Sequence, residues 1–267
     1  MNQKELDLIL ANHINWLNDK PGGERAVLTG AVLTDAVLTG AVLTRAVLTD
    51  AVLTDAVLTD AVLTGAVLTR AVLTRANFTR ANFTRADFTD AVLRDADFTG
   101  AVLTGAVLTD ADFTGAVLTR ANFTDAVLTD ADFTDANFTD AVLRGADFSG
   151  SKGLLTSKKF LSQFKKDKSG IYVYKTFGAY KTPPATWIIE KDSIIEETVN
   201  PDRCTECGSG INFATLDWIK NDSKAKKKNI WLCKILWEDT ADVIVPYNTD
   251  GKARCARLQL VKIVEEK

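Results

Sequence analysis

Several features common in other protein classes are scarce in this chain of 267 residues. Histidine and methionine each occur once, cysteine four times and proline five times. Four cysteines are too few for a disulfide framework at this length, so we expect a reducing, cytoplasmic setting. The sequence has no apolar run of about 18 residues, and its first residues lack the basic head and apolar stretch of a signal peptide. We therefore expect no membrane partner.

Motifs that carry catalysis are also missing. The sequence contains no phosphate-binding loop, no nucleophile elbow and no paired-carboxylate signature. We therefore predict a protein that is not an enzyme, with no catalytic residues and no cofactor. One enzymatic alternative stays open, a transferase-like site around Arg203 with Glu196 and Glu197.

Charge is distributed unevenly along the chain. Residues 1–25 carry a net charge of −1, residues 151–267 one of +6. Residues 26–150 contain 8 Arg and 16 Asp but neither Lys nor Glu, for a net charge of −8. This division indicates three segments of different composition.

The middle segment is an internal repeat of 25 pentapeptides without an insertion. Alanine opens every unit, and the third position is Leu sixteen times and Phe nine times. In extended backbone these two positions project to the same side, whereas positions two and four project to the other. A solenoid therefore follows, with Ala and Leu/Phe inside and the fifth residue at each corner.

The repeat pattern A-(V/N/D)-(L/F)-(T/S/R)-x resembles the pentapeptide-repeat family across all 25 units. The resemblance implies a right-handed quadrilateral β-helix with four pentapeptides in each coil, and hence a mainly β fold. With twenty residues per coil, we expect stacked pairs such as Phe78 over Phe98 and Phe113 over Phe133. At a strand spacing of about 4.8 Å, the rod is roughly 30 Å long.

The segment before the repeat, residues 1–25, is expected to be a helical cap. Leu6, Ile9, Leu10 and His13 fall on one face of an amphipathic helix, as do Ile14 and Leu17. A solenoid end needs such a cover for its apolar core. We expect His13, the single histidine, to pack in the interior rather than to act in catalysis.

The tail, residues 151–267, is expected to be a mostly β, α+β domain that can cap the other end of the rod. Its composition predicts short helices over 156–166 and 215–220, and it predicts strands over 171–177, 186–198, 230–237, 241–247 and 257–264. Residues 194–197, 207–216 and 245–252 are similar to an uncharacterised domain that follows pentapeptide repeats in bacterial and phage proteins. That resemblance implies a two-part layout and no activity.

The four cysteines of the tail leave three alternatives. Cys204 and Cys207 have the C-x-x-C spacing that zinc prefers, and Cys233 and Cys255 would complete four ligands. The first pair would alternatively be a redox pair. Ordinary reduced cysteine is the third reading, and the strand position of Cys233 favours burial.

The rod surface offers the candidate interaction residues. Val fills every outward second position from Val27 to Val72, so Val27, Val32, Val52 and Val72 mark an apolar band. Arg70, Arg75, Arg80 and Arg85 occupy four consecutive corners and form a basic ring. We expect ladders of Arg70 with Asp50 and Asp90, and of Arg75 with Asp55 and Asp95. The plain alternatives are β-propensity for the valines and solvated charges for the corners.

We therefore predict a structural or interaction scaffold that self-associates or presents a surface to another protein, with no direct nucleic-acid partner. The family resemblance supplies an alternative, since some members resemble DNA and bind DNA gyrase. Against that alternative, the rod carries −8 where a duplex of its length carries about −18. The lysine run 224–228 is expected to be a solvated loop, with nucleic acid or anionic lipid as the other possibility.

Overall fold

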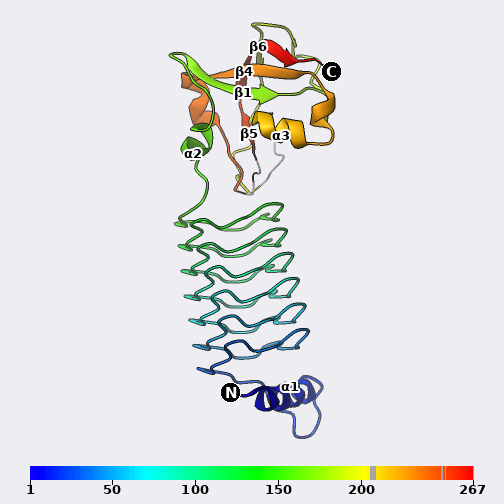
Figure 1. Cartoon of the computed structure of the whole chain (residues 1–267), viewed down its shortest axis with the longest axis vertical. Coiled ribbons are helices and arrows are strands. Elements are labelled where there is room, and N and C mark those ends of the chain that lie inside the picture. The colour runs from blue at the N-terminus through cyan, green and yellow to red at the C-terminus, as the bar shows by residue number, and fades with distance from the viewer. Residues whose placement is uncertain (205–208, 248, 250, 267) are drawn as a thin grey trace. The chain divides into compact units, whose positions relative to one another are not determined.

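Coils of twenty residues make up the first part of the chain (Figure 1). This computed structural model describes residues 1–204, 209–247, 249 and 251–266. It divides into two compact units, Met1–Leu154 and Leu155–Lys267. None of its described helices is long and apolar enough to cross a membrane.

Parallel pairing between residues twenty apart holds the coils together. Val27 pairs with Val47, and Val47 pairs with Val67, and this spacing continues to the pair of Asp132 with Lys152. The Leu28 amide donates to the Val47 carbonyl at 2.7 Å, and equivalent bonds recur from coil to coil. Each coil therefore contains four pentapeptides, the number that the family resemblance implied.

The interior of the rod is filled by the first and third residues of the repeats. From Leu43 to Leu128, the Ala, Leu and Phe side chains at these positions are at most 1% exposed. The predicted stacks are confirmed: the ring centroids of Phe78 and Phe98 lie 4.7 Å apart, and those of Phe113 and Phe133 lie 5.1 Å apart. Alanine suits its position because a larger side chain would overpack this space.

The fifth residue of every pentapeptide has a left-handed backbone, with φ between 55° and 71°. This conformation turns the chain at each corner. Glycine adopts it freely and Asp tolerates it, whereas other side chains pay about 1–2 kcal/mol. Arg nevertheless occupies six of these positions: Arg45, Arg70, Arg75, Arg80, Arg85 and Arg120.

Asn and Asp at the second position cap the turn of their own unit. The Oδ1 atom of Asn82 accepts hydrogen bonds from both the amide and the hydroxyl of Thr84, at 3.0 and 2.7 Å. Oδ1 also accepts the fourth-position amide in the other eight units that have Asn or Asp at the second position. These nine are the units with Phe in the core, a coupling for which the structure supplies no packing reason.

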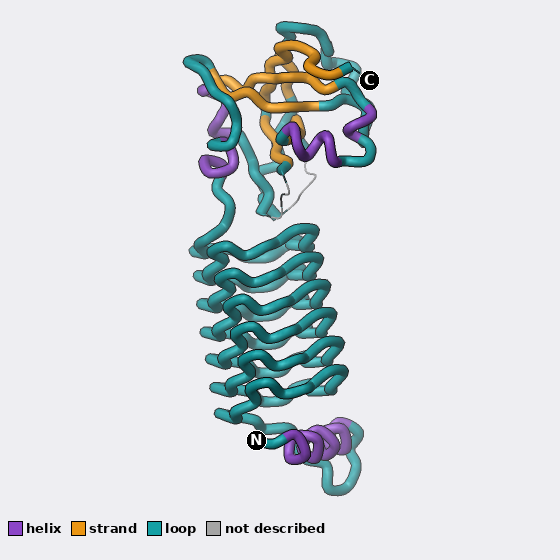
Figure 2. Tube along the Cα trace, in the orientation of Figure 1, coloured by secondary structure: helices purple, strands orange, loops and turns teal. Residues whose placement is uncertain are grey.

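Helix α1 (Gln3–Leu17) covers the N-terminal end of the rod (Figure 2). The side-chain amide of Gln3 donates a hydrogen bond to the Val37 carbonyl. The ammonium group of Met1 donates one to the Val32 carbonyl. Leu6 and His13 are buried, while Ile14 is 43% exposed, so the predicted apolar face is only partly covered.

His13 has the packing role that the sequence predicted. Its Nδ1 atom accepts a hydrogen bond from the Ala26 amide at 3.1 Å. Burial lowers the pKa of His13, and the backbone of Thr44 offsets part of that effect. The neutral ring thus joins the cap to the first repeat.

The second unit is built around an antiparallel sheet (Figures 1 and 2). Its described strands lie in the order β2-β6-β4-β1-β3-β5. The strands are β1 (Gly170–Lys175), β2 (Ile194–Glu196), β3 (Ile211–Ala214), β4 (Ile230–Leu236), β5 (Lys252–Cys255) and β6 (Arg257–Glu265). The helices are α2 (Ser157–Leu161) and α3 (Leu216–Asn221), with 3₁₀ turns η1 (Ala225–Lys227) and η2 (Trp237–Asp242).

Several elements of this unit differ from those that the sequence predicted. The strand expected over 186–198 is reduced to β2, since Asp192 has a φ of 67° and breaks the extended run. The strand expected over 241–247 is wrong: η2 reaches Asp242, and Ile244 makes only an isolated bridge to Arg254. Strands β3 and β5 are too short to show a clear alternation, and they were not predicted.

Phe98 provides a test of the core. It is fully buried and packs against four other phenylalanine rings, so Phe98→Ala should lower the free energy of unfolding by about 3–5 kcal/mol. Phe98→Leu should lower it by less than about 1.5 kcal/mol, since leucine fills the same position in sixteen units. Urea denaturation followed by circular dichroism measures both. Equal losses would contradict this description of the core.

Candidate interaction surfaces

The outward valines fall on separate faces of the rod. We number the faces by the pentapeptides that stack in each column. Face 1 has Val27, Val47, Val67, Asp87, Val107, Val127 and Asp147 at the second position, and face 2 has Val32, Val52, Val72, Val92, Asp112 and Asp132. The structure therefore brings the predicted residues Val32, Val52 and Val72 together, and it places Val27 on the neighbouring face.

The exposure of these valines varies along the rod. Val27, Val32 and Val37 are 59–61% exposed because they belong to the first coil. In the coils that follow, Val47, Val52 and their neighbours are half-buried between coils on either side. The valines therefore form separate columns, one on each face, and they are most exposed at the N-terminal end.

Three arginines of the predicted ring pair with Asp one coil earlier. Arg70 with Asp50, Arg75 with Asp55 and Arg80 with Asp60 form two-pronged ion pairs at 2.6–2.8 Å. Hydrogen bonds from these arginines lower the pKa of each Asp carboxyl.

The predicted ladders to the next coil do not form. Among the described residues, Asp90 and Asp95 make no ion pair with Arg70 or Arg75, which have already turned toward the N-terminal side. Each exposed pair contributes about 0–1 kcal/mol.

Arg85, the fourth member of the ring, lies between two glycines. Gly65 precedes it by one coil and Gly105 follows it by one coil, so its corner column offers no carboxylate in either direction. No described Asp or Glu lies within 4.0 Å of Arg85 or of Arg45, which shares that column. The positive charges of Arg45 and Arg85 are therefore not neutralised within the rod, unlike those of Arg70, Arg75 and Arg80.

The two halves of the rod differ in charge. Residues 26–85 carry a net charge of +1, with five Arg and four Asp. Residues 86–150 carry a net charge of −9, with twelve Asp and three Arg. The acidic character that the composition revealed therefore belongs to the C-terminal half alone.

The cysteines of the second unit have different surroundings. Cys233 and Cys255 are fully buried in the apolar core, and burial raises the pKa of both thiols, that of Cys233 to about 12. Cys204 is half-buried, with its pKa raised to about 11, and Cys207 lies outside the described residues. Within the described part, no three His, Cys, Asp or Glu side chains gather as metal ligands would. The zinc arrangement stays a prediction.

The sequence analysis missed three buried charged residues in the described part of the tail, Lys175, Asp239 and Arg254. Lys175 is 8% exposed, and its Nζ donates to the Asn212 carbonyl at 2.7 Å, 5.0 Å from the centre of the Phe177 ring. Burial without a carboxylate partner lowers its pKa to about 8. The alternation of side chains along β1 could have predicted this burial, because Lys175 falls on the same side of the strand as the core residues Ile171 and Val173.

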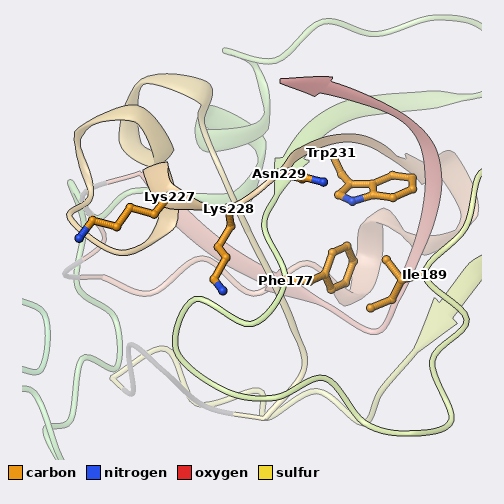
Figure 3. Close-up of a pocket in the computed structure, with 6 residues that line it drawn as sticks. All are labelled: Phe177, Ile189, Lys227, Lys228, Asn229 and Trp231. Atoms are coloured by element: carbon orange, nitrogen blue, oxygen red, sulfur yellow. The ribbon is translucent and has the colours of Figure 1, made fainter. Parts of the chain in front are cut away.

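A cavity of about 350 Å³ lies beside this part of the sheet. Figure 3 shows Phe177, Ile189 and Trp231 gathered on one side, with Lys228 reaching toward them. Lys227 and Asn229 complete the lining, which places the end of the predicted lysine run at the cavity.

The residues of the transferase-like alternative are occupied by other contacts. Arg203 donates from Nε to the Val245 carbonyl at 2.7 Å, and its guanidinium lies 4.1 Å from the centre of the Tyr247 ring. Glu196 forms an ion pair with Arg257 at 2.8 Å. The Oε1 atom of Glu197 accepts a hydrogen bond from the Thr198 amide. No hydrogen bond or ion pair between described atoms joins Arg203 to either glutamate.

A solenoid whose solid interior leaves only its outer faces for contact is typical of a repeat protein that binds other molecules along its side. The sequence model for pentapeptide repeats matches residues 24–60, 51–90, 81–120 and 116–152, with eight copies. Through these repeats the chain belongs to the pentapeptide-repeat family.

Several solved structures of pentapeptide repeat proteins are similar in sequence to part of this chain. A pentapeptide repeat protein from the cyanobacterium Cyanothece 51142 is 29% identical over 32% of this chain and 58% of its own, with a TM-score of 0.32. HetL, involved in heterocyst differentiation regulation in the cyanobacterium Nostoc sp. strain PCC 7120, is 30% identical over 48% of this chain and 72% of its own, with a TM-score of 0.26.

A pentapeptide repeat protein of the Arabidopsis thaliana thylakoid lumen is 29% identical over 37% of this chain and 71% of its own, with a TM-score of 0.29. The chain thus spans less than two thirds of the length of the Cyanothece protein. No curated protein matches the chain.

Lys175 gives a pH-dependent prediction. Between pH 8 and its ordinary pKa near 10.4, the unfolded state holds the proton that the folded state has lost, so this residue adds stability as the pH rises. At pH 7 its buried charge opposes folding, and Lys175→Met should stabilise the second unit by roughly 2–3 kcal/mol.

The measurement is urea denaturation of the wild type and of Lys175→Met from pH 7 to pH 10. The gap between them should shrink as the pH rises, and this difference cancels the titration of the cysteines. A gap that stays constant across this range would show that the amine is not destabilised by burial.

Proposed function

We propose that this protein is a non-enzymatic interaction scaffold whose rod self-associates or binds another protein along its side. The proposal takes each coil to be four-sided, with the right-handed winding that the family resemblance implies. It gives the second unit no catalytic role. The observation that carries it is the combination of a filled rod interior with columns of outward valine.

Two features of the rod support an interaction role. The interior from Leu43 to Leu128 contains only Ala, Leu and Phe at the inward positions, so no polar group lines it and a ligand has no room there. The outer valines form columns of apolar surface, which monomeric proteins tend to keep small. Val27, Val32 and Val37 expose the largest fraction of this surface.

Sedimentation velocity of the full chain tests the proposal. Over a roughly hundredfold range of concentration, we expect the mean sedimentation coefficient to increase, because association follows mass action. A single monomeric species at every concentration would overturn self-association, and the search would then turn to another protein partner.

A second candidate is an acidic rod that competes with DNA for a topoisomerase such as gyrase. The observation that favours it is the charge of residues 86–150, a net −9 over 13 pentapeptides. These units span about 16 Å at a coil spacing of about 4.8 Å, and a DNA duplex of that length carries about −9. The C-terminal half thus has the charge density of a duplex, which the whole rod does not.

A DNA supercoiling assay with gyrase tests this candidate. If it is correct, the protein should inhibit supercoiling, and the triple variant Asp90→Asn, Asp110→Asn, Asp130→Asn should inhibit several-fold less because three charges are lost. The matched control changes Asp35, Asp55 and Asp60 to Asn in the other half and should inhibit like the wild type. Absence of inhibition by the wild type would remove the candidate.

A further inference from the structure

We infer that face 1 of the rod is the surface on which a second copy of this chain docks, with the two rods parallel about a twofold axis. The inference rests on the proposed self-association and specifies its geometry. It is carried by the charges along the two edges of this face. One edge attracts the other edge of an identical rod.

The edges of face 1 are defined by the corner residues on either side of its pentapeptides. The residues before these pentapeptides form the arginine edge, and the residues that end them form the aspartate edge. The arginine edge contains Arg25, Arg45, Gly65, Arg85, Gly105 and Asp125. The aspartate edge contains Gly30, Asp50, Arg70, Asp90, Asp110 and Asp130.

The arginine edge carries charge that its own rod does not neutralise. Arg45 and Arg85 are exposed and have glycine at the next corner of the column, so no carboxylate reaches them from that side. Both also hold the left-handed conformation that Gly or Asp would adopt with less strain, with φ of 61° and 58°. Neither forms an intrachain ion pair with a described residue to offset this cost.

Symmetry decides which edges meet. If the twofold axis runs along the rod, the arginine edge of one copy lies opposite the aspartate edge of the other at the same coil level. Arg85 of one copy then faces Asp90 of the second, and Arg45 faces Asp50, each contact occurring twice. Asp50 is also bound by Arg70 of its own rod, so the contact of Arg85 with Asp90 carries more of the attraction. If the axis runs across the rod, each edge faces the same edge of the other copy with the coil order reversed, and no register then sets both Arg45 and Arg85 against an Asp. The parallel arrangement pairs both of these arginines.

The other faces lack this complementarity. In the same parallel arrangement, face 2 sets Asp50 against Asp55 and Arg70 against Arg75. Face 3 sets Asp55 against Asp60 and Arg75 against Arg80. Face 4 has one repulsive pair, Arg80 against Arg85, and one attractive pair, Arg120 against Asp125. Face 1 has one repulsive level, Asp125 against Asp130, and two attractive ones. It is the face on which unlike charges meet most often.

The surface between the two edges suits this contact. Five of the seven outward second positions of face 1 are valine, and its fourth positions are Thr or Ser, without the arginine that faces 2 and 4 carry there as Arg94 and Arg144. The twofold axis brings second positions of one copy against fourth positions of the other, so Val47 and Val67 meet threonine. Asp87 is already hydrogen-bonded to the amide and hydroxyl of Thr89.

The size of the face sets the expected strength. A side of about three extended residues is roughly 10 Å wide, and seven coil levels extend roughly 30 Å. A contact of about 300 Å² per copy is well below the about 800 Å² of a standard stable interface. We therefore expect a transient dimer that depends on its edge charges and weakens as salt screens them.

Charge reversal across the interface tests the inference. Arg85→Asp places a carboxylate opposite Asp90, and Asp90→Arg places a guanidinium opposite Arg85, so each variant should raise the dimer dissociation constant about tenfold. The double variant Arg85→Asp, Asp90→Arg restores unlike charges and should return the dissociation constant to within about twofold of the wild type. Asp and Arg both occur at these corners, so the variants keep the fold.

Two controls accompany the measurement by sedimentation velocity. Arg80→Asp makes the same change in charge at a corner that does not border face 1, and it should leave the dissociation constant unchanged. The pair Val47→Asn, Val67→Asn on face 1 should weaken the dimer, whereas Val52→Asn, Val72→Asn on face 2 should not.

The outcomes separate the inference from the proposed function. If the single variants at Arg85 and Asp90 leave the dissociation constant unchanged, the docking face is overturned and self-association remains. The same holds if the double variant has a dissociation constant as high as the single variants. It also holds for a loss of association caused only by the face 2 valines. A wild type that stays monomeric overturns the proposed self-association and this inference with it.

Discussion

The hydrogen-bond ladder between residues twenty apart is the constraint on which the rod depends. Each coil pairs with the next through bonds such as that from the Leu28 amide to the Val47 carbonyl, so every side chain has a counterpart one coil away. Positions repeat at a spacing of about 4.8 Å, and any property of one unit becomes a column. The phenylalanine stack, the valine faces and the ion pairs of Arg70, Arg75 and Arg80 are all consequences of this register.

The left-handed corner connects backbone geometry to surface charge. All 25 corners have positive φ, and they are occupied by Gly and Asp, which suit that conformation, and by Arg, which is strained in it. The corner is also the most outward point of the coil, so the choice among the three residues sets the charge of each edge. Where Asp precedes Arg by one coil, the charges neutralise each other. Where Gly stands on both sides, as Gly65 and Gly105 do for Arg85, the arginine charge remains available to another molecule.

The second unit follows different rules from the rod. Its sheet buries one apolar face with Cys233 and Cys255 among ordinary core side chains, and it also buries the ammonium group of Lys175 against rings and a carbonyl oxygen. A buried ammonium without a carboxylate is costly, and its pKa falls to about 8 as a result. The buried Lys175 ammonium lies near a cavity lined by Phe177 and Trp231, whereas the interior of the rod contains only Ala, Leu and Phe side chains.

The sequence alone determined the parts of this protein that depend on local periodicity. Strict repetition of five residues predicted the inward and outward positions, because these follow from the alternation of an extended chain. The stacking of Phe78 on Phe98 also needed the four units per coil that the family resemblance implies. Only the tertiary structure decided what depends on alignment between distant residues. It showed that Arg70 pairs with Asp50 but not with Asp90, and that Val27 and Val32 belong to different faces. It also showed that the segment 241–247 begins in a 3₁₀ turn and contains only an isolated bridge at Ile244. Such features depend on side-chain direction and on packing between segments far apart in the chain, which a one-dimensional pattern does not contain.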